Sequence, residues 1–272
     1  YRKSFGSMDL ERNKPMADDA IFRIYSMTKP ITSVALMMLY EKGYFQLNDP
    51  VSRYVPSWKD HRVYVSGEDE AMVTEPARRP ISFRDVLSHT AGLTYGGGLA
   101  GVGVQHPVDK LYRALKVRTV GGEDTMQSFL DKLGQVPLVY HPGERWMYSL
   151  ATDVCGALVE VISGKPFGQY LQDEIFGPLG MKDTSFSVAP EKVDRFCANY
   201  QRGPDKKLKL IDDPATSIFG RPASFESGGG GLTGTIDDYM RFCEMLRRGG
   251  ELDGVRILGP RTLEMIDRKS VV

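Results

Sequence analysis

The chain has 272 residues, of which 41% are hydrophobic and 26% charged, and its 35 basic residues balance 35 acidic ones. A formal net charge of zero argues against binding to nucleic acid or to an anionic membrane, since nothing in the composition creates a strong positive field. The three cysteines and four histidines are scattered, which excludes a disulfide framework or zinc motif and favours a reduced, cytoplasmic protein without a metal.

The first part of the chain predicts a hairpin-like opening over 1–25 followed by a helix. From Met27 onward, apolar residues recur at helical spacing along one face: Ile31, Val34, Ala35, Met38 and Leu39. Gly43 is expected to end this helix. Pro30 is tolerated only in a first turn, so the helix must begin close to Ser26.

The rest of the chain is predicted to be mainly helical. After a polar surface excursion over 57–80, helices are expected at 82–88, 107–117, 123–134, 150–164, 166–175 and 235–248. Two glycine-rich loops interrupt them, 96–103 and 228–231, and neither precedes the Lys-Ser/Thr of a phosphate-binding loop. We expect the first to be a mobile loop bordering a cleft.

The chemistry concentrates where the opening strand meets the first helix. Ser26 and Lys29 are three residues apart, so on a helix their Cβ atoms lie about 5–6 Å apart. A serine needs such a neighbour, or a base, to become a nucleophile. Taken alone the pair is more typical of a helix cap followed by a solvated lysine, because one S-x-x-K is expected by chance in a chain of this length.

A base must come from elsewhere in the chain. No serine has glycine two residues away on both sides, so the G-x-S-x-G elbow of α/β-hydrolases is absent. Tyr148, just ahead of the helix at 150–164, is a candidate because the Lys29 ammonium would favour its phenolate. Composition alone does not single it out among 13 tyrosines.

Five short motifs follow one another along the chain: FRIYSMTKP (22–30), LNDPV (47–51), LSHTAGL (87–93), PGERWMYS (142–149) and GGGGL (228–232). In this order they resemble the serine β-lactamase and penicillin-binding-protein superfamily, and specifically its class C β-lactamase-like esterases, the carboxylesterases of family VIII. The resemblance covers residues 5–56 and 80–258.

The resemblance implies an α+β, β-lactamase-like fold in which a helical domain packs beside an antiparallel sheet with flanking helices. It implies Ser26 as the acylated nucleophile, Lys29 as its proton-shuttling partner and Tyr148 as the general base, with no cofactor. The backbone N–H of Ser26 would be an oxyanion donor and His89 a structural hydrogen-bonder. The substrate cleft would be lined by Tyr25, Leu150, Gly229 and Gly230.

Three segments are expected on this basis: an α/β part with the nucleophile helix (1–56), a helical domain with the tyrosine motif (57–234), and the start of a return to the α/β part (235–272). Two departures from the family matter. Lactamases and peptidases carry Tyr-x-Asn where this chain has Leu150, which cannot bond a substrate amide; a buried amide left unpaired costs about 1–3 kcal/mol. The C-terminal Lys-Thr-Gly strand, or its Trp-Gly-Gly or His-x-Gly variants, has no match before Val272.

The missing strand, which supplies the second oxyanion N–H in the family, leaves three interpretations. Either the sequence continues beyond Val272, or another chain supplies strands, or the protein is an impaired relative; we favour the first. An exposed sheet edge would favour a homodimer. The chain does not begin with Met and has no apolar run long enough to span a membrane, so we expect an incomplete N-terminus and a cytoplasmic protein.

The expected activity is hydrolysis of a small-molecule, short-chain ester through an acyl-enzyme. Acyl transfer to an alcohol or amine is a close alternative. β-Lactamase or D-alanyl peptidase activity is disfavoured by Leu150. A catalytically silent binding module is supported by the missing strand and opposed by the presence of Ser26, Lys29 and Tyr148 together.

Overall fold

The computed structural model describes residues 3–97, 106–117, 120–121 and 124–267. Within these ranges the α-helices are α1 (Thr28–Glu41), α2 (Phe83–Leu87), α3 (Asp109–Ala114), α4 (Met126–Gly134), α5 (Ala151–Ser163), α6 (Phe167–Leu171), α7 (Gly177–Leu179), α8 (Ile236–Arg247) and α9 (Pro260–Asp267). The strands are β1 (Ser7–Asp9), β2 (Lys14–Pro15), β3 (Phe22–Arg23), β4 (Arg62–Ser66), β5 (Val73–Pro76), β6 (Asn199–Arg202), β7 (Leu208–Asp212), β8 (Thr233–Gly234), β9 (Glu251–Leu252) and β10 (Val255–Arg256).

The predicted α+β class is confirmed, and the strands are short. In the described part of the chain they pair two by two, always antiparallel. The antiparallel sheet expected beside the helices is therefore divided into small pieces. None of the described helices is long and apolar enough to cross a membrane.

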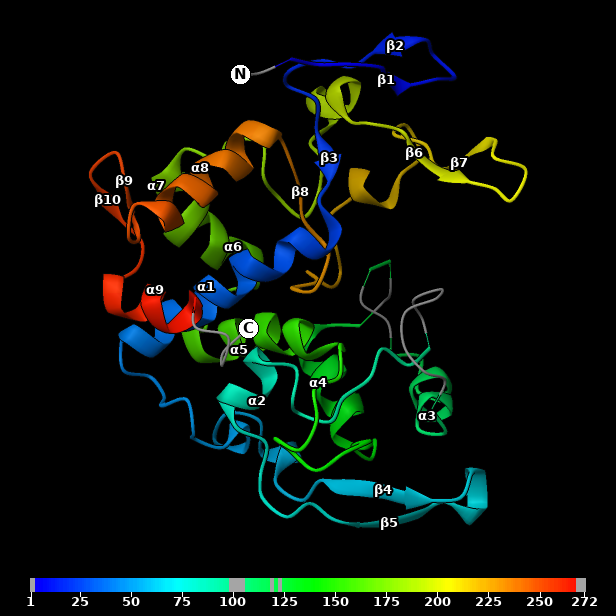
Figure 1. Ribbon diagram of the computed structural model, residues 1–272, viewed down its shortest axis with the longest axis vertical. Helices are drawn as coiled ribbons and strands as arrows, with labels where there is room; N and C mark the ends of the chain where they lie inside the picture. The colour runs from blue at the N-terminus through cyan, green and yellow to red at the C-terminus, as the bar shows by residue number, and fades with distance from the viewer. Residues whose placement is uncertain (1–2, 98–105, 118–119, 122–123, 268–272) are drawn as a thin grey trace.

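Helix α5 forms the centre of the main core. Helices α1, α2, α4 and α6 all pack against it, and Figure 1 shows α1 lying directly beside it. Every residue from Ala151 to Val159 is buried. This part of the helix is therefore enclosed on all sides and has no solvent-facing polar side. Gly164, with φ +69°, ends the helix in the left-handed conformation that glycine adopts without strain.

The predicted hairpin-like opening forms over β1 and β2, but the strand that leads to Ser26 is not part of it. Strand β1 pairs with β2, whereas β3 pairs with β8, placing Phe22 opposite Gly234 and Arg23 opposite Thr233. In Figure 1 β3 and β8 run side by side although they come from opposite ends of the sequence. Single-residue bridges extend this pair on both sides, from Ile21 to Phe196 and from Thr233 to Ser185. The strand that leads to Ser26 is therefore held on both of its edges.

Arg23 anchors a distant segment to strand β3. Its side chain is only 3% exposed and forms an ion pair with Asp212 at 2.5 Å. It also donates to the Cys197 carbonyl and to the Ser217 hydroxyl, and its guanidinium lies 3.9 Å from the centre of the Phe196 ring. A buried charge is tolerated when it is paired and fully hydrogen-bonded in this way. Residues 196–217 are thus fixed beside the strand that enters the candidate site.

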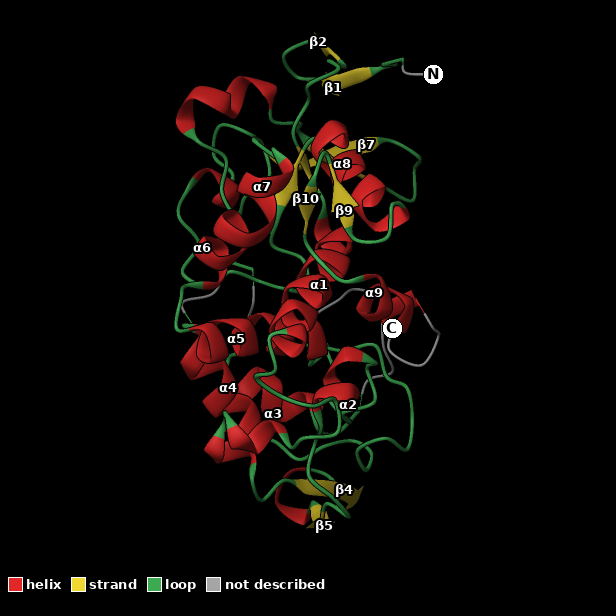
Figure 2. Cartoon of the chain, turned by 90° about the vertical axis from the view of Figure 1, so that its left-hand side faces the viewer, coloured by secondary structure: helices red, strands yellow, loops and turns green. Residues whose placement is uncertain are grey.

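The polar excursion predicted over 57–80 is mostly exposed, as expected, but it contains regular structure and part of it reaches the core. Strands β4 and β5 form an antiparallel hairpin there, which lies at the opposite end of the molecule from β1 and β2 (Figure 2). Trp58 and Val63 are 1% and 3% exposed and belong to the main core. The glycine-rich loop predicted over 96–103 lies outside the described residues from position 98 onward.

Helix α2, expected from the sequence, begins with a capping box. The Ser82 hydroxyl accepts from the Asp85 N–H, and the Asp85 carboxylate accepts from the Ser82 N–H. Burial would raise the pKa of Asp85, but two hydrogen bonds from Arg79 and those from Ser82 lower it overall. This fixed helix start positions the turn that carries His89.

Candidate active site

Ser26 lies in a single 3₁₀ turn, Tyr25–Met27, between β3 and α1. The turn is closed by the Met27 N–H, which donates to the Ile24 carbonyl at 2.9 Å. Tyr25 has φ +42°, a left-handed conformation that costs a residue with a side chain about 1–3 kcal/mol. A hydrogen bond from Asn199 to the Tyr25 hydroxyl, 2.7 Å long, helps to hold it. The Ser26 side chain is exposed at the start of the helix.

The structure brings the three predicted polar groups together. The Lys29 ammonium donates to Ser26 Oγ at 3.1 Å, and Ser26 Oγ lies 2.9 Å from Tyr148 Oη. Lys29 also donates to the Gly229 carbonyl at 2.6 Å, which fixes the ammonium between Ser26 and the glycine-rich loop 228–231. Residues from three separate parts of the chain thus share one hydrogen-bonded cluster.

The surroundings of Tyr148 favour its ionised form. Partial burial raises its pKa, but hydrogen bonding to Lys29 and to Ser26, and the Lys29 charge, outweigh burial and lower the pKa overall. The Lys29 nitrogen lies 4.8 Å from the centre of the Tyr148 ring. Burial and the nearby Asp153 carboxylate instead raise the pKa of the neighbouring Tyr95, so Tyr95 remains a phenol that can donate a hydrogen bond to Tyr148.

His89 holds the chain on both sides of Tyr148. Its carbonyl accepts from the Met147 N–H at 2.8 Å, and its Nδ1 accepts from the Ser149 N–H at 3.3 Å. Its Nε2 lies 3.3 Å from the Thr152 hydroxyl, and its ring centre lies 5.1 Å from that of Tyr148. Burial, helped by the Lys29 charge, lowers the pKa of His89 to about 4. A neutral imidazole making these bonds agrees with the structural role expected for it.

The glycine-rich loop 228–231, which precedes β8, needs glycine because it passes close to α5. The Gly229 N–H donates to the Asp153 carboxylate at 3.1 Å, and the Ser227 hydroxyl donates to it at 2.5 Å. A Cβ on Gly229 would lie 2.4 Å from Asp153 Oδ2, and one on Gly228 would lie 2.7 Å from the Thr152 carbonyl oxygen. Close approach of two backbones is a typical use of glycine. It places the Gly229 carbonyl where Lys29 can donate to it.

The residues predicted to line the substrate cleft fall into two groups. Tyr25 is 47% exposed, and Gly230 is half-buried with its backbone against that of Tyr25. Gly229 is buried and reaches the site through its carbonyl. Leu150 was placed wrongly: it is 4% exposed and packs in the main core. It precedes a helix enclosed on all sides, so its side chain has no open face to point toward.

Sequence reasoning did not identify Asp153 or Tyr95. Asp153 is 1% exposed, and burial raises its pKa despite the hydrogen bonds from Ser227 and Gly229. A carboxylate in the first turn of an otherwise apolar helix is a signal that could have drawn attention to it. Tyr95 follows the LSHTAGL motif, and nothing in its spacing indicates that its ring lies 5.3 Å from that of Tyr148.

A family model described as Beta-lactamase matches residues 1–271. The chain belongs to this family. Protein Rv1367c of Mycobacterium tuberculosis is 37% identical over 261 residues, covering 96% of this chain and 62% of that protein. Esterase EstB of Burkholderia gladioli is 31% identical over 262 residues, covering 91% of this chain and 62% of the esterase.

A solved structure described as "EstCE1, a hydrolase with promiscuous acyltransferase activity" matches with a TM-score of 0.77 at 28% identity, covering 97% of this chain and 67% of that one. The predicted membership of the serine β-lactamase superfamily and its fold are thereby confirmed. Members of this Beta-lactamase family that resemble the chain include an esterase and a hydrolase that also transfers acyl groups. The chain spans about 62% of the length of the curated relatives it matches.

Proposed function

We propose that this protein is a serine hydrolase that cleaves short-chain carboxylic esters through an acyl-enzyme, like the class C β-lactamase-like esterases of carboxylesterase family VIII. The observation that carries the proposal is the meeting of Ser26 Oγ, Lys29 Nζ and Tyr148 Oη within hydrogen-bonding distance. The similarity to Esterase EstB and to EstCE1 supports the same class of reaction.

In the acylation step the Tyr148 phenolate takes the proton of the Ser26 hydroxyl while Ser26 Oγ attacks the ester carbonyl carbon. Lys29 donates to Ser26 Oγ and stabilises the negative charge on both oxygens during this transfer. The carbonyl oxygen becomes an oxyanion, for which the Ser26 backbone N–H is the proposed donor. When the carbon–oxygen bond to the alcohol breaks, Tyr148 gives its proton to the departing alkoxide.

The acyl group then leaves by the reverse sequence. Tyr148, again a phenolate, takes a proton from water, the resulting hydroxide attacks the acyl carbon, and the Ser26 oxygen leaves with the proton that Tyr148 returns. The products are a carboxylic acid and an alcohol, and the enzyme regains its starting protonation. The proton transfers between Ser26 and Tyr148, assisted by Lys29, use contacts that already exist in the free protein.

Esters fit this site better than amides. The Tyr-x-Asn asparagine that would bond the amide of a β-lactam or peptide is replaced by Leu150, whose side chain lies in the core. A substrate amide bound there would lose its partner at a cost of about 1–3 kcal/mol. Rapid turnover of a chromogenic cephalosporin by the purified protein would reverse this preference.

Labelling with a fluorophosphonate tests the nucleophile directly. We expect one adduct, mapped by peptide mass spectrometry to Ser26, together with turnover of 4-nitrophenyl butyrate. Ser26→Ala should abolish both, whereas Ser33→Ala, a matched change on helix α1, should retain both. An adduct on any other residue, or a folded protein with neither labelling nor turnover, would favour the silent binding module instead.

Acyl transfer is the second candidate, supported by the acyltransferase activity in the description of EstCE1. An alcohol would then attack the Ser26 acyl-enzyme in place of water. Adding an alcohol at increasing concentration and measuring the ratio of new ester to free acid separates the two. A ratio that stays near zero identifies a hydrolase, and one that rises until ester dominates identifies a transferase.

A further inference from the structure

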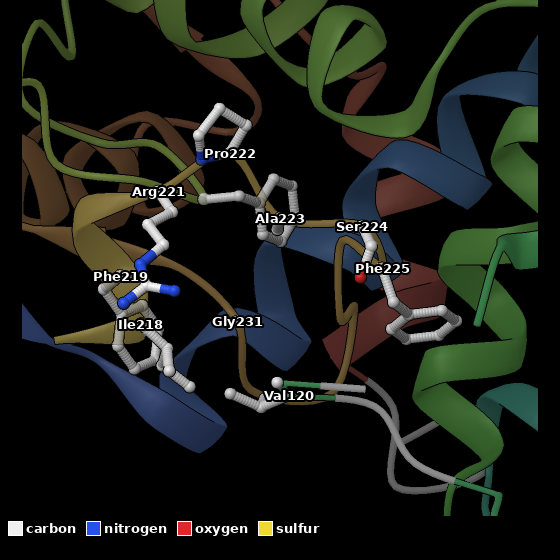
Figure 3. Close-up of a pocket in the computed structure, with 11 residues that line it drawn as sticks. Val120, Ile218, Phe219, Arg221, Pro222, Ala223, Ser224, Phe225 and Gly231 are labelled. Atoms are coloured by element: carbon white, nitrogen blue, oxygen red, sulfur yellow. The ribbon is translucent and has the colours of Figure 1, made fainter. Parts of the chain in front are cut away.

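A cavity of about 230 Å³ lies beside the glycine-rich loop 228–231. Most of its wall is apolar and comes from the segment around 218–225, from Phe186 and from Val120. Figure 3 labels most of the lining residues and shows the Arg221 side chain extending toward Ile218 and Phe219. Gly231 is the lining residue that comes from the glycine-rich segment 228–231.

The cavity and the candidate active site share one short piece of backbone. Gly231 is two residues from Gly229, whose carbonyl accepts from Lys29, and two residues of extended chain span at most about 7 Å. Between them, the Gly230 backbone packs on that of Tyr25: a Cβ on Gly230 would lie 3.7 Å from the Tyr25 carbonyl carbon. The cavity wall at Gly231 is therefore one residue from a direct backbone contact with Tyr25, the residue that precedes Ser26.

Arg221 is the one charged side chain among the described residues that line the cavity. No described carboxylate lies within ion-pair distance of it. Arg23, by contrast, is compensated by Asp212 and by two further acceptors. Arg221 is exposed, and its guanidinium offers parallel N–H groups that match a carboxylate.

We propose that this cavity binds a carboxylate carried on a short apolar arm of the ester and that Arg221 is its recognition residue. The inference rests on the proposed function and narrows its substrates to anionic esters. The carboxylate belongs either to the acyl part, as in a half-ester of a short dicarboxylic acid, or to the alcohol part. In both cases the apolar arm packs against Ile218 and Phe225 while the charge meets Arg221.

Paired substrates test the proposal on the full chain. Mono-4-nitrophenyl glutarate, with its carboxylate on the acyl side, is compared with 4-nitrophenyl pentanoate. 4-(Butyryloxy)benzoate, with its carboxylate on the alcohol side, is compared with its methyl ester. We expect kcat/KM to favour the anionic member of one pair, and the pair that responds identifies the side of the ester that enters the cavity.

Substitution of Arg221 should remove this preference. Arg221→Gln should lower kcat/KM for the preferred anionic ester about tenfold or more, the scale of one lost charge-assisted interaction, and leave its neutral counterpart within about twofold. Arg221→Lys should recover part of the loss, and Arg202→Gln, an exposed arginine on β6, should change neither ester. Equal changes for both members of each pair, or no anionic preference in the unmodified protein, would overturn the proposal.

Direct binding separates this proposal from the proposed function. Monomethyl glutarate, titrated calorimetrically into the Ser26→Ala protein, should bind measurably and about tenfold more weakly once Arg221→Gln is added. Binding of this kind, together with an unmodified protein that hydrolyses no ester, would sustain the anion site and reject the hydrolase. Turnover of neutral esters at Ser26 without Arg221-dependent binding would do the reverse.

Discussion

The buried imidazole of His89 makes the stability of this protein depend on pH in a direction that can be calculated. Asparagine is the replacement of choice because His89 has φ +56°, a conformation that asparagine tolerates well. His89→Asn keeps the backbone bond to Met147, offers its side-chain oxygen to the Ser149 N–H in place of Nδ1, and removes both the titrating ring and its contact with Thr152. At pH 7 the variant should be about 1 kcal/mol less stable, the usual net value of one buried hydrogen bond.

The pH effect follows from the difference between the folded and unfolded pKa values. The folded pKa of His89 is about 4, because burial and Lys29 disfavour the imidazolium, against 6.5 in an unfolded chain. As the pH falls, the unfolded chain therefore binds the proton first. The stabilisation is fully present above about pH 6.5, is lost progressively toward pH 4, and amounts to about 2.5 kcal/mol between pH 7 and 4.5.

His89→Asn does not carry this loss, so the order of stability should reverse. The unmodified protein should be about 1 kcal/mol more stable than the variant at pH 7 and about 1.5 kcal/mol less stable at pH 4.5. Urea unfolding followed by circular dichroism at several pH values measures both numbers. Thr152→Val removes the same contact without removing the ring, so it should keep the pH slope of the unmodified protein. A constant difference across this range for His89→Asn would refute the reasoning.

Three further predictions concern the cluster at Ser26. Tyr148→Phe should lower kcat for an ester by about 10²–10⁴, the usual share of proton transfer, with the folded structure retained by circular dichroism. Lys29→Met removes the hydrogen bond and charge that lower the pKa of Tyr148; the rise of kcat/KM with pH, which tracks the phenolate, should then move to higher pH in a stopped-flow or plate-based profile. Gly229→Ala forces a Cβ to 2.4 Å from Asp153, so thermal unfolding should show a loss of about 1–3 kcal/mol, and kcat should fall because the carbonyl that holds Lys29 moves.

Local spacing was enough to predict that Ser26 and Lys29 lie close together, although it did not by itself mark them as a site. Ser26 and Lys29 are three residues apart at a helix start, and such neighbours meet whatever the rest of the chain does. Pro30 also fixed the start of α1 to within two residues of its observed position at Thr28. Both inferences depend on contacts within one turn of backbone, where sequence patterns are most informative.

The second half of the site depends on long-range contacts that spacing does not encode. Tyr148 reaches Ser26 because α1 packs against α5 and because β3 pairs with β8, and it was identified only through its motif. The misplaced Leu150 has the same origin, since a motif position says nothing about which way a side chain points. The pairing of β3 with β8 could not be predicted from the sequence either, because each strand spans only two residues. Two residues are too few for an alternating pattern.

The two helices that carry the site both begin there, and this explains how it can hold a phenolate next to an ammonium. Ser26 precedes α1 by two residues, and Tyr148 precedes α5 by three. Helix N-termini carry partial positive charge, so both dipoles, like Lys29, stabilise an anion on Tyr148 or on a bound acyl oxygen. Asp153, in the first turn of α5, occupies a position where a helix favours a carboxylate. The Asp153 carboxylate accepts a hydrogen bond from the Gly229 N–H, and the Gly229 carbonyl accepts one from Lys29. The Asp153 carboxylate thus fixes the glycine-rich loop 228–231. The Lys29 charge remains directed at Ser26 Oγ and Tyr148 Oη, the two oxygens between which the proton moves in the proposed reaction.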